Sequence, residues 1–362
     1  MKRAAVAVAA TLGLFVLVQI GSLALIQPFM DAGYQTVEDP SDPTNSLLYI
    51  GAILVATAVM LAAMKFGVDR LLQGLIVFAA VFLAFYVFTV VIPPVVTVAG
   101  LNVPAVLAAL GLGVGLLVYP EWYVIDAAGI VMGAGAAGLF GISFGLLPAL
   151  VLLVVLAVYD AISVYGTEHM LTLASGVMDL RLPVVLVIPL TLSYSFLEES
   201  GPETLDDEGR SDRENGGSTN REDGESADND GQERSGSEET DAGTAENDDP
   251  ADEKAEDPFA RDAFFIGLGD AVIPTILVAS AAFFRPGGAA LLEVPWIALT
   301  VPALGAMAGT LAGLVVLLWM VMKGRAHAGL PLLNGGAIAG YLLGSVLVGI
   351  ALIEAIGIAP YV

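Results

Sequence analysis

Residues 146–165 read LLPALVLLVVLAVYDAISVY, an apolar run that contains a single acidic residue, Asp160. A helix needs about 20 apolar residues to cross the ~30 Å hydrocarbon core of a bilayer, and this run has that length. A carboxylate inside such a helix costs a few kcal/mol or more, so acids at this depth are rare and mark functional sites by default. The run therefore predicts both a membrane-spanning helix and a candidate functional residue.

Apolar runs of this kind recur along the chain. Hydrophobic residues make up 56% of its 362 residues, and the mean hydropathy is +0.79, which is more apolar than a soluble domain of this size requires. The expected fold class is an all-α polytopic membrane protein with nine transmembrane helices. The predicted spans lie near residues 4–26, 46–64, 71–92, 101–119, 123–140, 146–165, 262–284, 295–320 and 330–353.

One segment carries most of the charge. The net charge is −24, and −19 of it lies between Glu198 and Asp257, in a stretch rich in Asp, Glu, Gly, Ser, Asn and Thr. Such a stretch cannot bury enough apolar surface to offset its chain entropy, so we expect a disordered cytoplasmic loop between the sixth and seventh helices. Its charge argues against nucleic acid as a partner and suits a halophilic archaeal source.

The acidic loop organises the rest of the chain into parts. We expect a six-helix membrane part at residues 1–165, an interfacial segment at 166–194, the loop at 195–261 and a three-helix membrane part at 262–362. Within the interfacial segment, residues 182–189 read LPVVLVIP, which is too short to span a bilayer and rich in β-branched residues. This stretch predicts a strand at the cytoplasmic membrane surface.

The basic residues predict the orientation in the membrane. Cytoplasmic loops of membrane proteins carry an excess of Lys and Arg. If the N-terminus lies inside, the cytoplasmic side receives every Lys and Arg of the chain except Arg285. We therefore expect a multi-pass cell-membrane protein with a cytoplasmic N-terminus and, after nine spans, an extracytoplasmic C-terminus.

A second deep acid follows the acidic loop. Asp270 ends the tetrapeptide Gly267-Leu268-Gly269-Asp270, about eight residues into the seventh predicted span, and Asp160 lies about six residues before the sixth span ends. Both are then roughly 10 Å from the cytoplasmic end of antiparallel helices, so their carboxylates can meet. Two carboxylates in one site share a proton, and one can act as a base toward water while the other acts as an acid. The glycines would let a neighbouring backbone approach or leave room for an extended substrate.

These two sequences carry a family resemblance. Tyr159-Asp160 and Gly267-Leu268-Gly269-Asp270 resemble the YD and GxGD motifs of the presenilin and signal-peptide-peptidase family of intramembrane aspartyl proteases. That family has nine spans, a cytosolic N-terminus and a long cytosolic loop between spans six and seven, so the chain resembles it throughout. The resemblance implies an archaeal presenilin homologue in which Asp160 and Asp270 are catalytic and Tyr159, Gly267, Leu268 and Gly269 support them.

The third motif of the family, PAL, has an altered counterpart at the start of the ninth predicted span. Residues 329–334 read GLPLLN, with Leu332 where the family has Ala. The resemblance assigns Pro331, Leu332 and Leu333 to the lining of the active site and to substrate binding. Pro331 also suits the first turn of a helix in its own right.

The resemblance implies an endopeptidase that cuts peptide bonds within transmembrane segments of membrane proteins or signal peptides. Its partners would be transmembrane peptides or proteins and the lipid bilayer. An oligomer is also compatible with this interpretation. The stretch Arg181 to Ile188 resembles the family loop that pairs with substrate as a strand, as unwound backbone in lipid requires. No metal and no cofactor are expected, and the chain has no cysteine and two histidines for a metal site.

Other functions remain open from the sequence. An ion- or proton-coupled transporter or channel would use the same aspartates as a relay. A structural membrane scaffold would tolerate Asn at both positions, and prepilin-type peptidases use membrane-associated aspartates in a similar setting without a PAL-like element. Residues 141–145 match the GxSxG pattern of serine hydrolases, but both histidines are expected on the opposite side of the membrane from Ser143.

Overall fold

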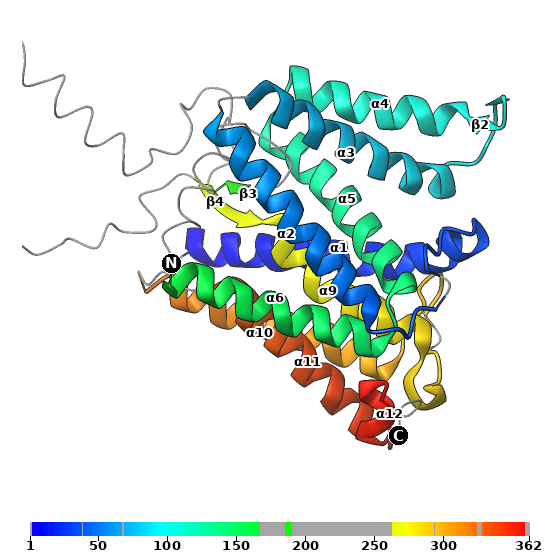
Figure 1. The fold of residues 1–362 in the computed structure, drawn as a ribbon, viewed down its shortest axis with the longest axis vertical. Helices are drawn as coiled ribbons and strands as arrows, with labels where there is room; N and C mark the ends of the chain where they lie inside the picture. Colours follow the sequence, from blue (N-terminus) through cyan, green and yellow to red (C-terminus); the bar gives the residue numbers. More distant parts are fainter. Residues whose placement is uncertain are drawn as a thin grey trace, which may run out of the picture. The chain divides into compact units, whose positions relative to one another are not determined.

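A computed structural model gives the fold of the chain (Figure 1). It describes residues 2–37, 39–66, 69–166, 185–189, 263–292, 294–323 and 328–358. The chain divides into two units, one made of Met1–Pro202 with Asp257–Val362 and one of Glu203–Glu256. The second unit lies outside the described residues, as do most of the expected interfacial segment and acidic loop, so the following concerns the first unit.

Helices form most of this unit. They are α1 (Lys2–Asp31), α2 (Thr44–Lys65), α3 (Asp69–Val91), α4 (Val103–Val118), α5 (Trp122–Ser143), α6 (Leu146–Gly166), α9 (Leu268–Phe284), α10 (Val301–Val321), α11 (Gly329–Leu347), the short α12 (Leu352–Ile356) and a 3₁₀ turn, η1 (Pro286–Gly288). Two antiparallel pairs of strands accompany them: β1 (Thr97–Val98) with β2 (Leu101–Asn102), and β3 (Val185–Pro189) with β4 (Ala263–Gly267).

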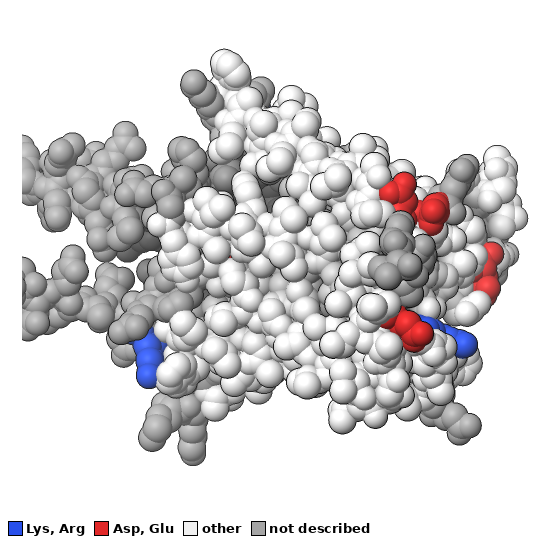
Figure 2. All heavy atoms as spheres, turned by 60° about the horizontal axis from the view of Figure 1, so that its bottom comes forward, with Lys and Arg blue, Asp and Glu red and all other residues white. Residues whose placement is uncertain are grey.

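Each predicted span overlaps one of these helices. Among the described residues, seven helices are long and apolar enough to cross a membrane, whereas α4 and α9 are apolar but shorter, with 16 and 17 residues. Figure 2 fits a membrane protein, because the face that it shows is uncharged across the middle and carries its few charged residues near two opposite ends. The chain is thus a mostly helical, multi-pass membrane protein.

The seventh predicted span is wrong at its start. Residues 263–267 form strand β4, and α9 begins only at Leu268. The reason lies in the sequence Ala-Phe-Phe-Ile-Gly, since aromatic and β-branched residues favour a strand where a partner strand is present. That partner is β3, which forms within the stretch predicted as a strand, and the register pairs Val185 with Gly267 and Pro189 with Ala263.

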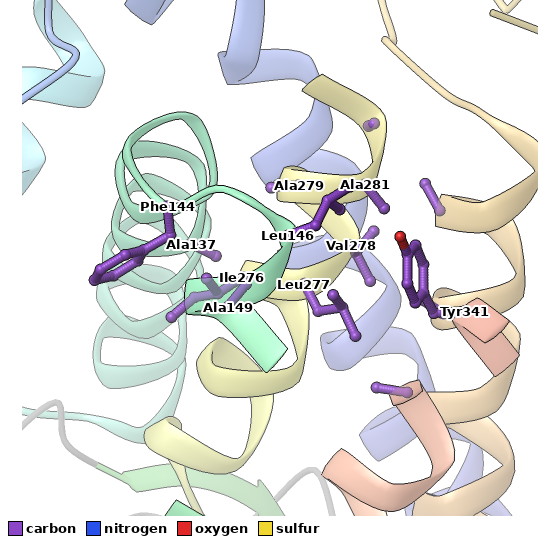
Figure 3. Packing of buried hydrophobic residues seen from close by; sticks show 14 of the residues in the cluster. Ala137, Phe144, Leu146, Ala149, Ile276, Leu277, Val278, Ala279, Ala281 and Tyr341 are labelled. Carbon is purple, nitrogen blue, oxygen red and sulfur yellow. The ribbon is translucent and has the colours of Figure 1, made fainter. Parts of the chain in front are cut away.

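Helix α9 occupies the centre of the bundle. It packs against α1, α5, α6, α10 and α11, and its residues 276–279 and 281–282 belong to the largest buried cluster. Figure 3 shows this part of α9 between Ala137 of α5 and Phe144, the residue after α5, on one side and Tyr341 of α11 on the other. The approach of α5 is close, because a side chain at Gly141 would collide with Ala279. The core therefore fixes α9 along most of its length.

Helices α10 and α11 touch backbone to backbone. Side chains at Gly305, Gly309 and Gly313 of α10 would collide with carbonyl oxygens of α11, those of Gly340, Gly336 and Leu332 in turn. Glycines at one-turn spacing allow this contact, because only they leave room for a neighbouring backbone. Among the described helices this pair has the most extensive contact, and its close backbone approach reaches Leu332, in the PAL-like motif.

Candidate active site

Asp160 lies in the last third of α6 and is buried, with 4% of its surface exposed. Its Oδ2 accepts a hydrogen bond of 3.0 Å from the backbone N–H of Leu330, the second residue of α11. The first N–H groups of a helix have no partner within the helix, and the N-terminal end of a helix attracts anionic groups. The carboxyl group of Asp160 therefore caps α11.

Asp270 is the third residue of α9, not the eighth of a longer span, because β4 occupies the preceding residues. The side chain is half-buried. Its Oδ2 lies 3.5 Å from the position that a Cβ would take at Gly267 and 3.4 Å from the corresponding position at Gly329. The carboxylate thus lies between the end of β4 and the beginning of α11.

The two aspartates approach the same two residues. Asp160 reaches Leu330 from α6, and Asp270 reaches Gly329 from α9. Helices α6 and α9 are in contact, as the sequence predicted for the spans that flank the acidic loop. The structure therefore brings two acids from distant parts of the sequence to the N-terminus of α11.

The neighbours of the aspartates differ from what the sequence predicted. Gly267 and Gly269 do not lie together on one helix, since Gly267 ends β4. Among the described residues, a Cβ at Gly267 would meet only Asp270, and a Cβ at Gly269 would meet only Ile273, at 3.9 Å. The expected approach of a neighbouring backbone is therefore not found in the described part of the chain, and the described residues leave space at Gly269. Leu268 is buried, whereas 40% of the Tyr159 surface is exposed.

The PAL-like residues occupy the first turns of α11. Pro331 is the third residue of the helix, so the prediction of a helix-start proline is confirmed. Leu332 turns its carbonyl oxygen to Gly313 of α10. Leu333 is fully buried in a cluster that also contains Leu268. The motif thus joins α10, α11 and the beginning of α9 directly beside the two carboxylates.

Two residues that the sequence did not single out hold α11 against α6. The hydroxyl of Tyr165 accepts a hydrogen bond of 3.4 Å from the N–H of Ala328, and Asn334 Nδ2 donates one of 2.9 Å to the carbonyl oxygen of Leu153. With the bond from Leu330 to Asp160, three hydrogen bonds join the two helices. Asn334 follows Leu330 by one helical turn, and that spacing is the only sequence signal for it.

Asp126 of α5 is another buried acid, outside the meeting point of the two aspartates. It is 7% exposed, and its Oδ1 accepts a hydrogen bond of 2.7 Å from the N–H of Val187 in β3. Within the ranges that the structure describes, no group of three or more His, Cys, Asp or Glu residues is placed to hold a metal ion.

Comparisons with known proteins agree with this geometry. A sequence profile of the family described as "Signal-peptide peptidase, presenilin aspartyl protease" matches residues 12–350. A solved presenilin family intramembrane aspartate protease in space group C222 is 32% identical, with a TM-score of 0.58, over 94% of this chain and 99% of that one. Another, in space group P2, is 31% identical with a TM-score of 0.56, over 93% and 97%.

A search among curated proteins gave no match. The family profile covers most of the chain, and the solved proteases align along nearly its whole length at more than 30% identity. Neither finding supports a transporter. The chain belongs to the signal-peptide peptidase and presenilin family of intramembrane aspartyl proteases.

Proposed function

We propose that Asp160 and Asp270 are the catalytic pair of this protease. The observation that carries the proposal is the meeting of both carboxylates at Gly329 and Leu330, although α6 and α9 are separated by the longest polar stretch of the chain. Two interacting carboxyl groups hold one proton between them more readily than none, which provides an acid and a base in one site.

The pair hydrolyses a peptide bond in two steps. The ionised aspartate removes a proton from a water molecule as the water oxygen attacks the peptide carbonyl carbon, and the protonated aspartate gives its proton to the carbonyl oxygen. The resulting gem-diol then collapses. One aspartate donates a proton to the amide nitrogen, the other takes a hydroxyl proton, and the C–N bond breaks to leave a carboxylic acid and an amine.

The substrate is a transmembrane segment of a membrane protein or a signal peptide. Its helix must unwind before a peptide carbonyl is accessible, and the freed backbone groups then need hydrogen-bond partners in an environment without water. The β3–β4 pair supports this role, because β4 ends at Gly267 and Asp270 follows three residues later. β3 packs against α5, so we place the added substrate strand on the β4 side of this sheet.

The space at Gly269, next to Asp270 in the sequence, supports a position for the scissile peptide bond beside Asp270. Gly269 is exposed, and a side chain there would meet only Ile273. A substrate strand on the outer edge of β4 continues toward this space. The PAL-like residues Pro331 to Leu333 line the site from the side of α11.

We also propose nine spans, with α4 and α9 as short spans, and a cytoplasmic N-terminus. The support is the distribution of basic residues. In this topology every Lys and Arg except Arg285 lies on the cytoplasmic side. The C-terminus is then extracytoplasmic, and the acidic loop lies on the same side as the catalytic pair. No nucleic acid partner fits the acidic charge, and self-association within the bilayer is compatible with the exposed apolar helices.

Cleavage by purified protein in liposomes tests the catalytic assignment. Wild-type protein is expected to cut a transmembrane peptide, with products identified by mass spectrometry. Asp160→Asn and Asp270→Asn should each lower the rate by about 10²-fold to 10⁴-fold, because either change removes an acid–base group. Asp42→Asn serves as the control. Asp42 lies in an exposed loop, far in sequence from both aspartates, so this change should leave the rate unchanged. Wild-type rates in either active-site variant would contradict the assignment.

A further inference from the structure

Asp126 is a buried carboxylate that the proposed chemistry does not use. It lies on α5, in the second turn, and 7% of its surface is exposed. An acid at such a place is costly unless a hydrogen bond or a charge compensates its burial. A buried Asp126 therefore requires a hydrogen-bond partner, and the identity of that partner indicates the role of Asp126.

The partner is the middle of strand β3. The N–H of Val187 donates to Asp126 Oδ1 at 2.7 Å, which is within the short range of hydrogen bonds to carboxylates. In an antiparallel pair, successive residues of a strand direct their N–H and C=O groups alternately toward and away from the partner strand. Val187 lies opposite Phe265 of β4, yet its N–H is directed at α5. Asp126 therefore occupies the edge of β3 that faces away from β4.

Gly129, one turn further along α5, also contacts β3. We call Asp126 and Gly129 together the seat of β3 on α5. A Cβ at Gly129 would lie 2.8 Å from Cδ2 of Leu186, which is closer than side chains tolerate, so the absence of a side chain makes room for Leu186. Leu186 is almost fully buried, with 1% exposed. One face of α5 thus holds two successive residues of β3, Leu186 through its side chain and Val187 through its backbone.

The position of β3 determines the position of β4, the strand that leads to Asp270. β3 pairs with β4 over all five residues, and Val185 lies opposite Gly267, the last residue before α9. Any shift of β3 along or away from α5 is transmitted through this pairing to the residues that precede Asp270. The attachment of β3 to α5 is therefore the contact through which α5 acts on the residues before Asp270.

We propose that Asp126, with Gly129, is a positioning residue that fixes the register of the β3–β4 sheet and thereby selects which peptide bond of the substrate reaches the two aspartates. This inference rests on the proposed function, because it assumes that the substrate adds to the same sheet. Asp126 touches neither the substrate nor the reacting atoms. Its effect is on the place of cleavage first and on the rate second.

The test is the distribution of cleavage products from one transmembrane peptide in liposomes, measured by mass spectrometry. Asp126→Leu keeps the size of the side chain but removes the acceptor, so products cut at neighbouring bonds should appear and the rate at the main bond should fall about 10-fold to 100-fold, as expected for a small misplacement of substrate. Asp126→Asn keeps an acceptor oxygen and should retain the main product at a rate within a few-fold of wild type.

A matched control separates positioning from general loss of stability. Thr310→Val removes another buried hydrogen bond, from Thr310 Oγ1 to the carbonyl oxygen of Ala306, on a helix that does not carry the sheet. It should lower the melting temperature without changing the product distribution. If Asp126→Leu does not fold, Gly129→Ala gives the same test from the other half of the seat, because its new methyl group displaces Leu186.

Several results would overturn the inference. A folded Asp126→Leu or Gly129→Ala protein with wild-type products and rate shows that the seat on α5 does not set the register. Equal product shifts in Asp126→Asn and Asp126→Leu show that the hydrogen-bond acceptor is not the cause. Absence of all cleavage by wild-type protein is a different outcome, since it contradicts the proposed function itself and is recognised before any variant is compared.

Discussion

The two halves of the candidate active site differ in how firmly the chain holds them. On the α6 side, Asp160 is buried and bonded to Leu330, and two further hydrogen bonds tie α6 to α11. On the α9 side, Asp270 is half-buried, and its carboxylate accepts no hydrogen bond from the part of the chain that the structure describes. Open space adjoins it at Gly269.

This difference assigns different tasks to the two sides. A carboxylate that caps a helix keeps its place whether or not a substrate is present. A carboxylate beside open space can meet water and an incoming peptide. The α6 side therefore acts as the fixed reference of the site and the α9 side as the surface toward which the substrate moves.

Among substitutions that keep both aspartates, filling the space beside Asp270 is expected to have the largest effect on activity. Gly269→Leu places a side chain where the structure has open space, so it should obstruct the substrate and lower kcat/KM on the order of 10-fold to 100-fold. Folding should be unaffected, because leucine favours helices more than glycine does. Peptide cleavage in liposomes and thermal melting measure the two effects. Unchanged cleavage would show that the substrate does not use this side.

Crowding the α11 side should instead destabilise the protein. In Gly313→Ala the new methyl group collides with the carbonyl oxygen of Leu332, and overpacking of this kind costs about 1–3 kcal/mol. Gly335→Ala on α11 is the matched control, since nothing lies within 4 Å of its added Cβ, and its stability should stay at or slightly above that of wild type. Thermal melting in detergent distinguishes them. Equal melting temperatures would refute the tight contact.

Removal of each carboxylate should separate the two sides by stability. Asp160→Ala deletes the acceptor that caps α11, which costs about 0.5–2 kcal/mol, whereas Asp270→Ala has no such bond to lose. Both variants should be inactive, so melting curves rather than activities carry the comparison. A lower melting temperature for Asp270→Ala than for Asp160→Ala would reverse the assignment of the fixed side.

The smallest effect is expected from Tyr165→Phe. This change removes only the hydroxyl that accepts the 3.4 Å hydrogen bond from Ala328. Single side-chain hydrogen bonds in membrane proteins contribute about 0.6 kcal/mol on average, and a bond of this length should contribute no more. Melting temperature and cleavage rate should both change slightly. A loss of activity comparable to that of Gly269→Leu would give Tyr165 a role beyond holding α11.

Much of the fold was predictable from the sequence because bilayer length and apolar runs are local properties. The strand at Val185–Pro189 was predictable for the same reason, from its β-branched residues. The strand Ala263–Gly267 was not separated from the helix after it, because Phe264 to Ile266 are as apolar as a span and reveal their conformation only through the partner strand.

The site was predictable only in part. The acids stood out because carboxylates are rare in apolar runs, and the two motifs gave their pairing. Asp126 was not singled out, because its partner Val187 is 61 residues away and no pattern in the sequence relates them. Tyr165 and Asn334 were missed for the same reason. Hydrogen bonds between distant segments are consequences of the fold and have no periodicity of their own.

The backbone contact between α10 and α11 has a mechanical consequence. Because Gly305, Gly309 and Gly313 leave no space for side chains between the two backbones, a slide by one residue would drive methyl or isobutyl groups into carbonyl oxygens. The two helices are therefore expected to move as one unit that carries the PAL-like residues at one end. A rearrangement that shifts α11 is therefore expected to shift α10 with it, and it would have to break or carry along the three hydrogen bonds to α6.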